Sequence, residues 1–128
     1  MNLILPISLG AVLGALSRHF LVLYFSRLFP LIQAQLPFST LIVNVLGSFF
    51  MGLFIELAAL KFSVSPELRA FISVGFLSSF TTLSSVALDF TLLTEKGDLL
   101  VGLIYIALSM MLSVLAVFLA FSLVRMIG

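Results

Sequence analysis

Residues 75–86 read GFLSSFTTLSSV, and six of these twelve side chains carry a hydroxyl group. The stretch lies inside a segment, residues 70–88, that contains no charged side chain. A continuous helix can satisfy a few serine and threonine hydroxyl groups through the carbonyls of the preceding turn. Six hydroxyl groups within eight positions favour instead a helix that is broken near its middle.

The amino-acid composition indicates the class of protein. Hydrophobic residues make up 62% of the 128 positions, charged residues make up 9%, and the mean hydropathy is +1.37. These values lie far outside the averages of soluble proteins and indicate an integral membrane protein. The chain contains no cysteine, which excludes disulfides, thiolate nucleophiles and cysteine metal sites. Its net charge of +1 offers no patch for nucleic acid.

Four segments without Asp, Glu, Lys or Arg divide the chain, at residues 1–17, 28–55, 70–88 and 99–124. Each is near the length of about 20 residues that a helix needs to cross a bilayer. Turn residues separate them. The sequence predicts an all-α integral membrane protein, with a single domain over residues 1–128 and four transmembrane helices at about 3–26, 38–60, 67–94 and 98–125. The first stretch lacks the charged start and cleavage site of a signal peptide, so we expect it to be retained.

The basic residues give almost no bias toward one orientation in the membrane. With four spans, Lys61, Arg69 and Arg125 lie on the side of the termini, and Arg18, Arg27 and Lys96 lie toward the other side. An excess of Lys and Arg on one side normally decides orientation. Either a partner or one dominant charge sets the orientation, or the chain inserts both ways and forms an antiparallel dual-topology dimer.

Polar and small residues recur every four positions in the second and fourth predicted helices. The second helix carries Thr40, Asn44, Ser48 and Gly52, with Gly47 beside them, and the fourth carries Tyr105, Ser109 and Ser113. Such spacing places each set on one helix face. The glycines and serines are also typical of ordinary helix packing. The amide of Asn44 is different, because at membrane depth it needs hydrogen-bond partners and can offer two N–H groups to an anion.

A broken third helix would suit a bound cation. Unwound backbone is tolerated at membrane depth where it is buried in protein or coordinates an ion. Freed carbonyls are good ligands for a hard cation such as sodium. No carboxylate lies within residues 75–86, so such an ion would be held by carbonyl and hydroxyl oxygens alone.

Three motifs together resemble the small fluoride channels of the Fluc or CrcB family. They are GAVLGALSRH at 10–19, STLIVNVLGSFFMG at 39–52 and GFLSSFTTLSSV at 75–86. The resemblance implies an antiparallel homodimer with two pores, a structural sodium ion at the dimer centre, and passive, highly selective fluoride conduction. It also implies resistance to fluoride toxicity through export across the cell inner membrane or plasma membrane.

The resemblance also implies roles for individual residues. Six match the anion pathway of the family, namely Thr40, Asn44, Ser84, Tyr105, Ser109 and Ser113. Ser78 and Thr81 match the residues whose backbone carbonyls hold sodium, and Arg18 and Gly47 match structural positions.

Two departures from the family pattern fall in the third helix. Its glycine pair is Ser78-Ser79 here, and its two phenylalanines are Leu83 and Val86. An aromatic edge can face a dehydrated anion, which leucine and valine cannot do. Phe76 and Phe80 are nearby, but on a helix they would face elsewhere. Two interpretations stay open: a homodimer with an altered anion path, or one subunit of a heterodimeric fluoride channel whose similar short sister supplies the rings.

Two other classes fit the sequence less well. A small multidrug-type, proton-coupled exporter needs a carboxylate within the membrane. The acidic residues are Glu56, Glu67, Asp89, Glu95 and Asp98, all toward the ends of the spans. An enzyme is not expected, because the one histidine, His19, has no neighbouring acid or nucleophile in the sequence.

Overall fold

The computed structural model describes residues 2–128, and every regular element within them is a helix. The elements are α1 (Ile4–Leu28), α2 (Pro30–Gln35), α3 (Phe38–Leu60), α4 (Pro66–Arg69), the π-helix η1 (Ala70–Leu77), α5 (Ser78–Phe80), α6 (Leu83–Glu95) and α7 (Leu99–Ile127). Four stretches are long and apolar enough to cross a membrane: Ile4–Leu28, Phe38–Leu60, Pro66–Glu95 and Leu99–Ile127. The prediction of an all-helical chain with four such helices is therefore confirmed.

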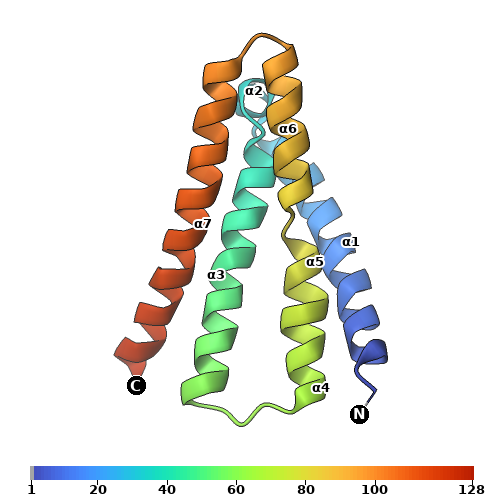
Figure 1. Ribbon diagram of the computed structural model, residues 1–128, viewed down its shortest axis with the longest axis vertical. Coiled ribbons are helices and arrows are strands. Elements are labelled where there is room, and N and C mark those ends of the chain that lie inside the picture. Colours follow the sequence, from blue (N-terminus) through green and yellow to red (C-terminus); the bar gives the residue numbers. More distant parts are fainter. Residues whose placement is uncertain (1) are drawn as a thin grey trace.

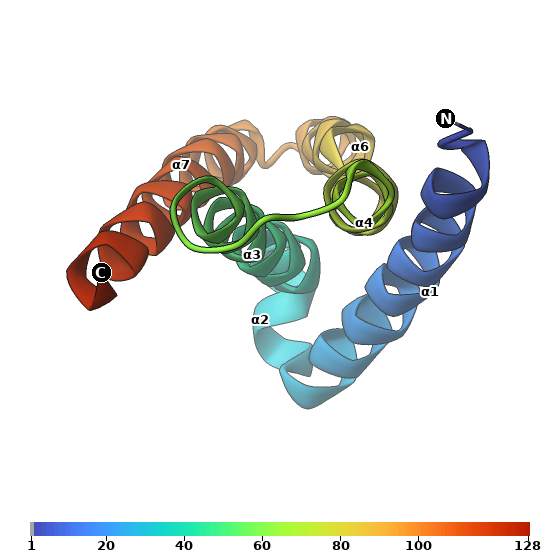
Figure 2. The same cartoon turned by 90° about the horizontal axis from the view of Figure 1, so that it is seen from below.

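The four spans run along the long axis of the molecule (Figure 1). Both chain ends lie at the same end as the loop between α3 and α4, while α2 and the turn between α6 and α7 lie at the opposite end. Seen along the spans, α1 and α7 lie on opposite sides of the molecule, with α3 and the third span between them (Figure 2). The third span packs on α1 through η1 and α5, whereas its second half, α6, packs on α7.

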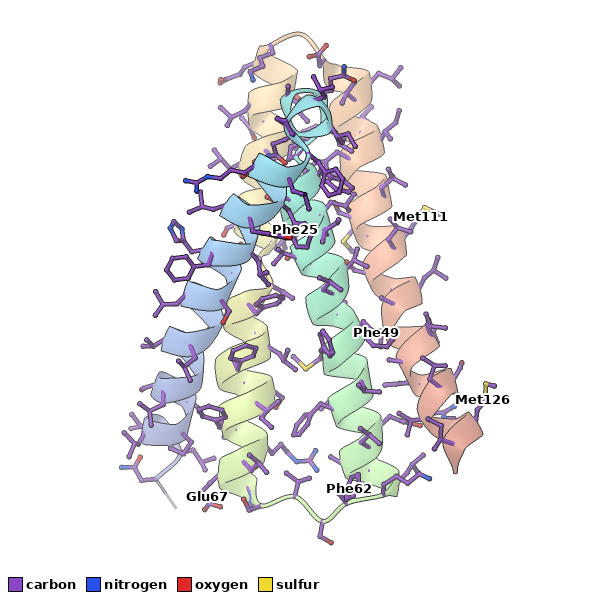
Figure 3. All side chains as sticks on the ribbon, turned by 180° about the vertical axis from the view of Figure 1, so that it is seen from behind. Phe25, Phe49, Phe62, Glu67, Met111 and Met126 are labelled. Carbon is purple, nitrogen blue, oxygen red and sulfur yellow. The ribbon has the colours of Figure 1, made fainter. Side chains whose placement is uncertain are left out.

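Large apolar side chains cover the outer faces of α1 and α7. Met111 and Met126 project away from the neighbouring helices in Figure 3, and they are 60% and 80% exposed. Such a surface is stable against lipid tails and unstable in water. This surface and the four spans indicate a multi-pass membrane protein.

The short helix α2 was not expected from the sequence, where Pro30 and Pro37 indicate turns. Pro30 instead occupies the first turn of α2, where its fixed φ angle and missing N–H are harmless. The side-chain oxygen of Gln33 then accepts a hydrogen bond from the backbone N–H of Ser39 at 3.0 Å. Because the N-cap residue of α3 offers no side-chain acceptor, α2 supplies this cap from outside the helix.

Glycines bring α1 and the first half of the third span into backbone contact. Gly10, Gly14 and Gly75 are buried. A methyl group added at Gly75 would lie 2.7 Å from the carbonyl oxygen of Ile7, and one at Gly14 would collide with the carbonyl of Phe76. Small residues allow helices in a membrane to approach this closely. The packing of α1 therefore fixes the position of η1.

The fourth span is joined to α3 by packing and by charge. Gly52 faces α7, where an added methyl group would lie 3.0 Å from the carbonyl oxygen of Val117. Near the end that holds the termini, Arg125 donates a hydrogen bond to the buried carboxylate of Glu56 and lies over the ring of Phe121. The Arg125 side chain is 63% exposed, so its removal would leave the buried carboxylate of Glu56 without a partner.

The third span changes its backbone conformation between α5 and α6. Thr81 has φ −88° and ψ 156°, and Thr82 has φ −153° and ψ 118°, so both residues are extended. The Thr82 hydroxyl accepts a hydrogen bond from the N–H of Ser85 at 3.2 Å and thereby caps α6. The short connection that joins the two helical segments is visible in Figure 1.

Candidate functional site

The extended residue Thr82 is paired with the side chain of Asn44 on α3. The Nδ2 atom of Asn44 donates to the carbonyl oxygen of Thr82 at 3.1 Å, and its Oδ1 atom accepts from the N–H of Thr82 at 2.8 Å. The amide thus satisfies both backbone groups of one residue, as a neighbouring β-strand would. Asn44 is buried, and one N–H of its Nδ2 atom remains for another acceptor.

This pairing changes the hydrogen bonding of the turn before it. In a continuous helix the N–H of Thr82 would bond to the carbonyl of Ser78, and the N–H of Ser85 would bond to the carbonyl of Thr81. Here Thr82 donates to Asn44 and Ser85 donates to the Thr82 hydroxyl. The carbonyls of Ser78 and Thr81 therefore lack their usual helical donors. These are the two groups predicted to hold sodium, and their chemistry suits that ion.

No acidic or histidine cluster competes with these carbonyls as a metal site. Within residues 2–128 there is no group of three or more His, Cys, Asp or Glu side chains that could hold a metal ion.

A cavity of about 150 Å³ opens beside the Asn44–Thr82 pair. It is lined by Asn44, Ser48, Thr81, Thr82, Leu83, Val86, Ser109, Met110 and Ser113. The structure thus brings together residues of α3, α6 and α7 that were predicted separately. We call this space the α7-side cavity.

Ser109 is the most informative hydroxyl of the α7-side cavity. Its side chain is buried, and within the described part of the chain its Oγ atom has no hydrogen-bond partner. Buried polar groups normally have one. Its hydroxyl group is therefore available to an ion or a water molecule in the cavity.

A second cavity, of about 210 Å³, lies on the side of α1. Its lining consists of Arg18, His19, Val22, Thr40, Val43, Thr82 and Ser85. We call it the α1-side cavity. Thr40 and Arg18 therefore line a different space from Ser109 and Ser113, and Thr82 lines both spaces. Ser84 is exposed nearby, with its hydroxyl 3.0 Å from that of Thr82.

Tyr105 lines neither cavity. It is fully buried, and its hydroxyl donates to the carboxylate of Asp89 on α6 at 2.8 Å. Sequence reasoning counted Asp89 only among the acids near span ends and missed this partner. A signal was present, because Asp89 follows Ser85 by four residues and so shares its face of the predicted helix.

Phe76 and Phe80 do not take the places of the missing phenylalanines. Their rings stack on each other with centroids 6.0 Å apart and line an apolar cavity between α1, α3 and the third span. Leu83 and Val86 line the α7-side cavity instead. Leu83 is 74% exposed, whereas Val86 is buried, so the two positions differ in the space available for a larger side chain.

Gly47 allows α3 to approach the connection between α5 and α6. A methyl group at this position would collide with the Thr81 side chain and lie 2.9 Å from the Phe80 ring. This contact lies one helical turn from Asn44. The structural role predicted for Gly47 thus has a geometric basis in the pairing of α3 with Thr82.

Comparison with known proteins agrees with this architecture. The family described as "CrcB-like protein, Camphor Resistance (CrcB)" matches residues 5–121. The chain belongs to the CrcB family. Its similarity to individual CrcB relatives extends over almost the whole sequence. A protein of Rhizobium etli named "Fluoride-specific ion channel FluC" is 40% identical over 121 residues, which cover 94% of each chain.

Two further relatives carry the same name. The Trichormus variabilis protein is 41% identical over 126 residues, covering 97% of this chain and 89% of its own. The Rhodospirillum centenum protein is 41% identical over 125 residues, covering 98% and 97%. The predicted membership of the CrcB family is therefore confirmed along nearly the full chain.

Proposed function

We propose that this CrcB-family protein is a passive, fluoride-selective ion channel that exports fluoride and so protects the cell from its toxicity. The observation that carries the proposal is the α7-side cavity, where an unpartnered buried hydroxyl, Ser109, lines the same space as the Asn44 amide. The name shared by the relatives, fluoride-specific ion channel, supports the same ion.

The chemistry of the cavity suits a small, strongly hydrated anion. Fluoride leaves water only where hydrogen-bond donors replace its hydration shell, and hydroxyl and amide N–H groups are such donors. Ser109, Ser113 and the remaining N–H of Asn44 can act on the α7 side. On the α1 side, the charge of Arg18 raises the local concentration of anions.

A proton-coupled exporter is the less favoured function. It would require a carboxylate that exchanges protons within the membrane. The best placed acid, Asp89, accepts a hydrogen bond from Tyr105 and lines neither cavity. The relatives are named channels, so we also expect no enzymatic activity.

The working unit in this proposal is an antiparallel, dual-topology homodimer with two pores. The even division of basic residues between the two ends favours insertion in both directions. A structural sodium ion would lie at the dimer centre, held by the carbonyls of Ser78 and Thr81, whose helical donors bond elsewhere. The third span would then act as a broken helix at Thr81, in the cell inner membrane or plasma membrane.

The alternative is that this chain is one subunit of a heterodimeric channel. Leu83 and Val86 line the cavity where the family resemblance implies rings, and Phe76 and Phe80 face another space. A similar short sister chain would then supply aromatic edges to the pathway.

Fluoride efflux from liposomes that contain only the purified chain tests the function. Efflux without an imposed proton gradient, and far above chloride efflux, is the expected result for a self-sufficient homodimer. A folded dimer that releases no fluoride would favour the heterodimer. Efflux that requires a proton gradient would contradict the channel.

Labelling of a C-terminal tag tests the dual topology. The tag is expected to be accessible from both faces of the membrane in cells that express no sister subunit. A tag accessible from one face alone would contradict the antiparallel homodimer while leaving the channel function open.

A further inference from the structure

We infer that Asn44 is the positioning residue of the proposed sodium site, because its side chain holds the backbone at Thr82 in the extended form and so frees the carbonyl of Ser78. The inference rests on the structural sodium ion proposed above. The geometry that carries it lies within a single chain. It gives Asn44 a second role, distinct from that of an N–H donor to the anion.

The first step of the argument is the competition for the Thr82 N–H. Two acceptors compete for it: the Ser78 carbonyl, which a continuous helix would use, and the Oδ1 atom of Asn44. The structure selects Asn44, at 2.8 Å. A buried N–H that lost this acceptor would turn to the Ser78 carbonyl, since unpaired buried backbone groups are avoided.

The second step concerns the other half of the pairing. Nδ2 of Asn44 donates to the Thr82 carbonyl at 3.1 Å, so Thr82 is held at both its backbone groups. A side-chain amide offers a donor and an acceptor on two adjacent atoms, which matches the N–H and C=O groups of one residue. Because Thr82 is extended at φ −153° and ψ 118°, a return to the helix would require a large rotation of ψ.

The third step is that α3 is placed for this contact. Gly47 lies one turn beyond Asn44 and leaves room for the Thr81 side chain, so the α3 backbone can approach the connection. The same residue, Asn44, also lines the α7-side cavity. The anion path and the cation site therefore share one side chain, which acts on the cation only through Thr82.

Three variants separate the two roles. Asn44→Asp keeps an oxygen that can accept from the Thr82 N–H but loses the N–H that bonds the Thr82 carbonyl, whereas Asn44→Val removes donor and acceptor together. Ser109→Ala is the matched control, because it removes a hydroxyl from the same cavity that is hydrogen-bonded to neither Thr82 nor Ser78. Each is compared with the wild-type chain as a purified dimer.

The first readout is the ¹³Cα chemical shift of Thr82, which reports backbone conformation and needs no ion flux. We expect an extended value in the wild type, in Asn44→Asp and in Ser109→Ala, and a helical value in Asn44→Val. An extended value in Asn44→Val would overturn the inference. If Asn44→Val does not fold, Asn44→Ser, whose side chain is too short to span the same gap, is measured in its place.

The second readout is the rise in melting temperature when sodium replaces N-methylglucamine. We expect Ser109→Ala and Asn44→Asp to keep this rise, and Asn44→Val to lose it or to need about tenfold more sodium, as expected when a group that orients a ligand is lost. Unchanged sodium stabilisation in Asn44→Val would also overturn the inference. A wild type with neither sodium stabilisation nor fluoride efflux would refute the proposed function, while the Thr82 shift would still decide whether Asn44 holds the backbone.

Discussion

The third span contacts its neighbours in two contrasting ways, before and after Thr81. Before it, η1 meets α1 through Gly10, Gly14 and Gly75, with backbone against backbone. After it, the span is held by two hydrogen bonds between Thr82 and Asn44 of α3, and by one between Asp89 and Tyr105 of α7. Close packing fixes where the first half lies, whereas hydrogen bonding fixes how the backbone turns. The two halves of one span are therefore held by different kinds of contact.

Breaking the glycine contact is expected to have the largest effect. In Gly14→Leu the new side chain would meet the carbonyl of Phe76, a backbone atom that cannot move aside. We expect a loss of about 3 kcal/mol or more of stability, and failure to purify a monodisperse protein. Leu13→Ala is the control, because Leu13 lies on the same helix and is 49% exposed. A folded Gly14→Leu protein with wild-type melting temperature would contradict the packing argument.

A charge at the hydrogen-bonded contact is expected to stop conduction and leave assembly intact. In Asn44→Asp a carboxylate would repel the anion, and about 3 kcal/mol of repulsion corresponds to about a hundredfold loss of fluoride flux. Flux in liposomes and dimer content by size-exclusion chromatography measure the two effects. Unchanged flux would remove Asn44 from the anion path, and a lost dimer would show that the two halves of the span are not separable.

Aromatic rings added beside the hydrogen-bonded half of the span test whether their absence limits conduction. Leu83→Phe with Val86→Phe would place aromatic edges on the α7-side cavity. One edge-on contact worth about 1 kcal/mol corresponds to about a fivefold gain in fluoride flux.

The controls for this double variant follow from burial. Leu83 is exposed and Val86 is buried, so overpacking is expected at Val86 alone and is measured by comparing both single variants at equal dimer content. A folded, dimeric double variant with no gain in flux would show that the missing rings do not limit this protein.

The smallest effect is expected for the cap of α3. The capping residue Gln33 makes no hydrogen bond to either half of the third span. In Gln33→Ala the N–H of Ser39 would lose its acceptor, at a cost of about 1 kcal/mol to the stability of the helix that carries Asn44. The exposed Gln35→Ala is the matched control, and thermal melting is the measurement. Equal melting temperatures for the two variants would show that α2 does not stabilise α3.

Much of the architecture was predictable because it depends on local composition. Charge-free segments of sufficient length predict the four spans, and the structure places them at Ile4–Leu28, Phe38–Leu60, Pro66–Glu95 and Leu99–Ile127. The four-residue spacing that includes Asn44 and Ser109 also predicts one-sided polar helices. Hydropathy and periodicity repeat along the chain, so they are visible without knowledge of the neighbours of each helix.

The partners of those polar groups were decided only by the tertiary structure. Asn44 and Thr82 are 38 residues apart. Nothing in this spacing shows that the Asn44 side chain bonds both the N–H and the carbonyl of Thr82. The same holds for Asp89 with Tyr105 and for the separation of Thr40 from Ser109 into two cavities. A hydrogen bond between helices depends on the rotation and axial register of each helix, and close packing sets both of these only once all the spans are assembled.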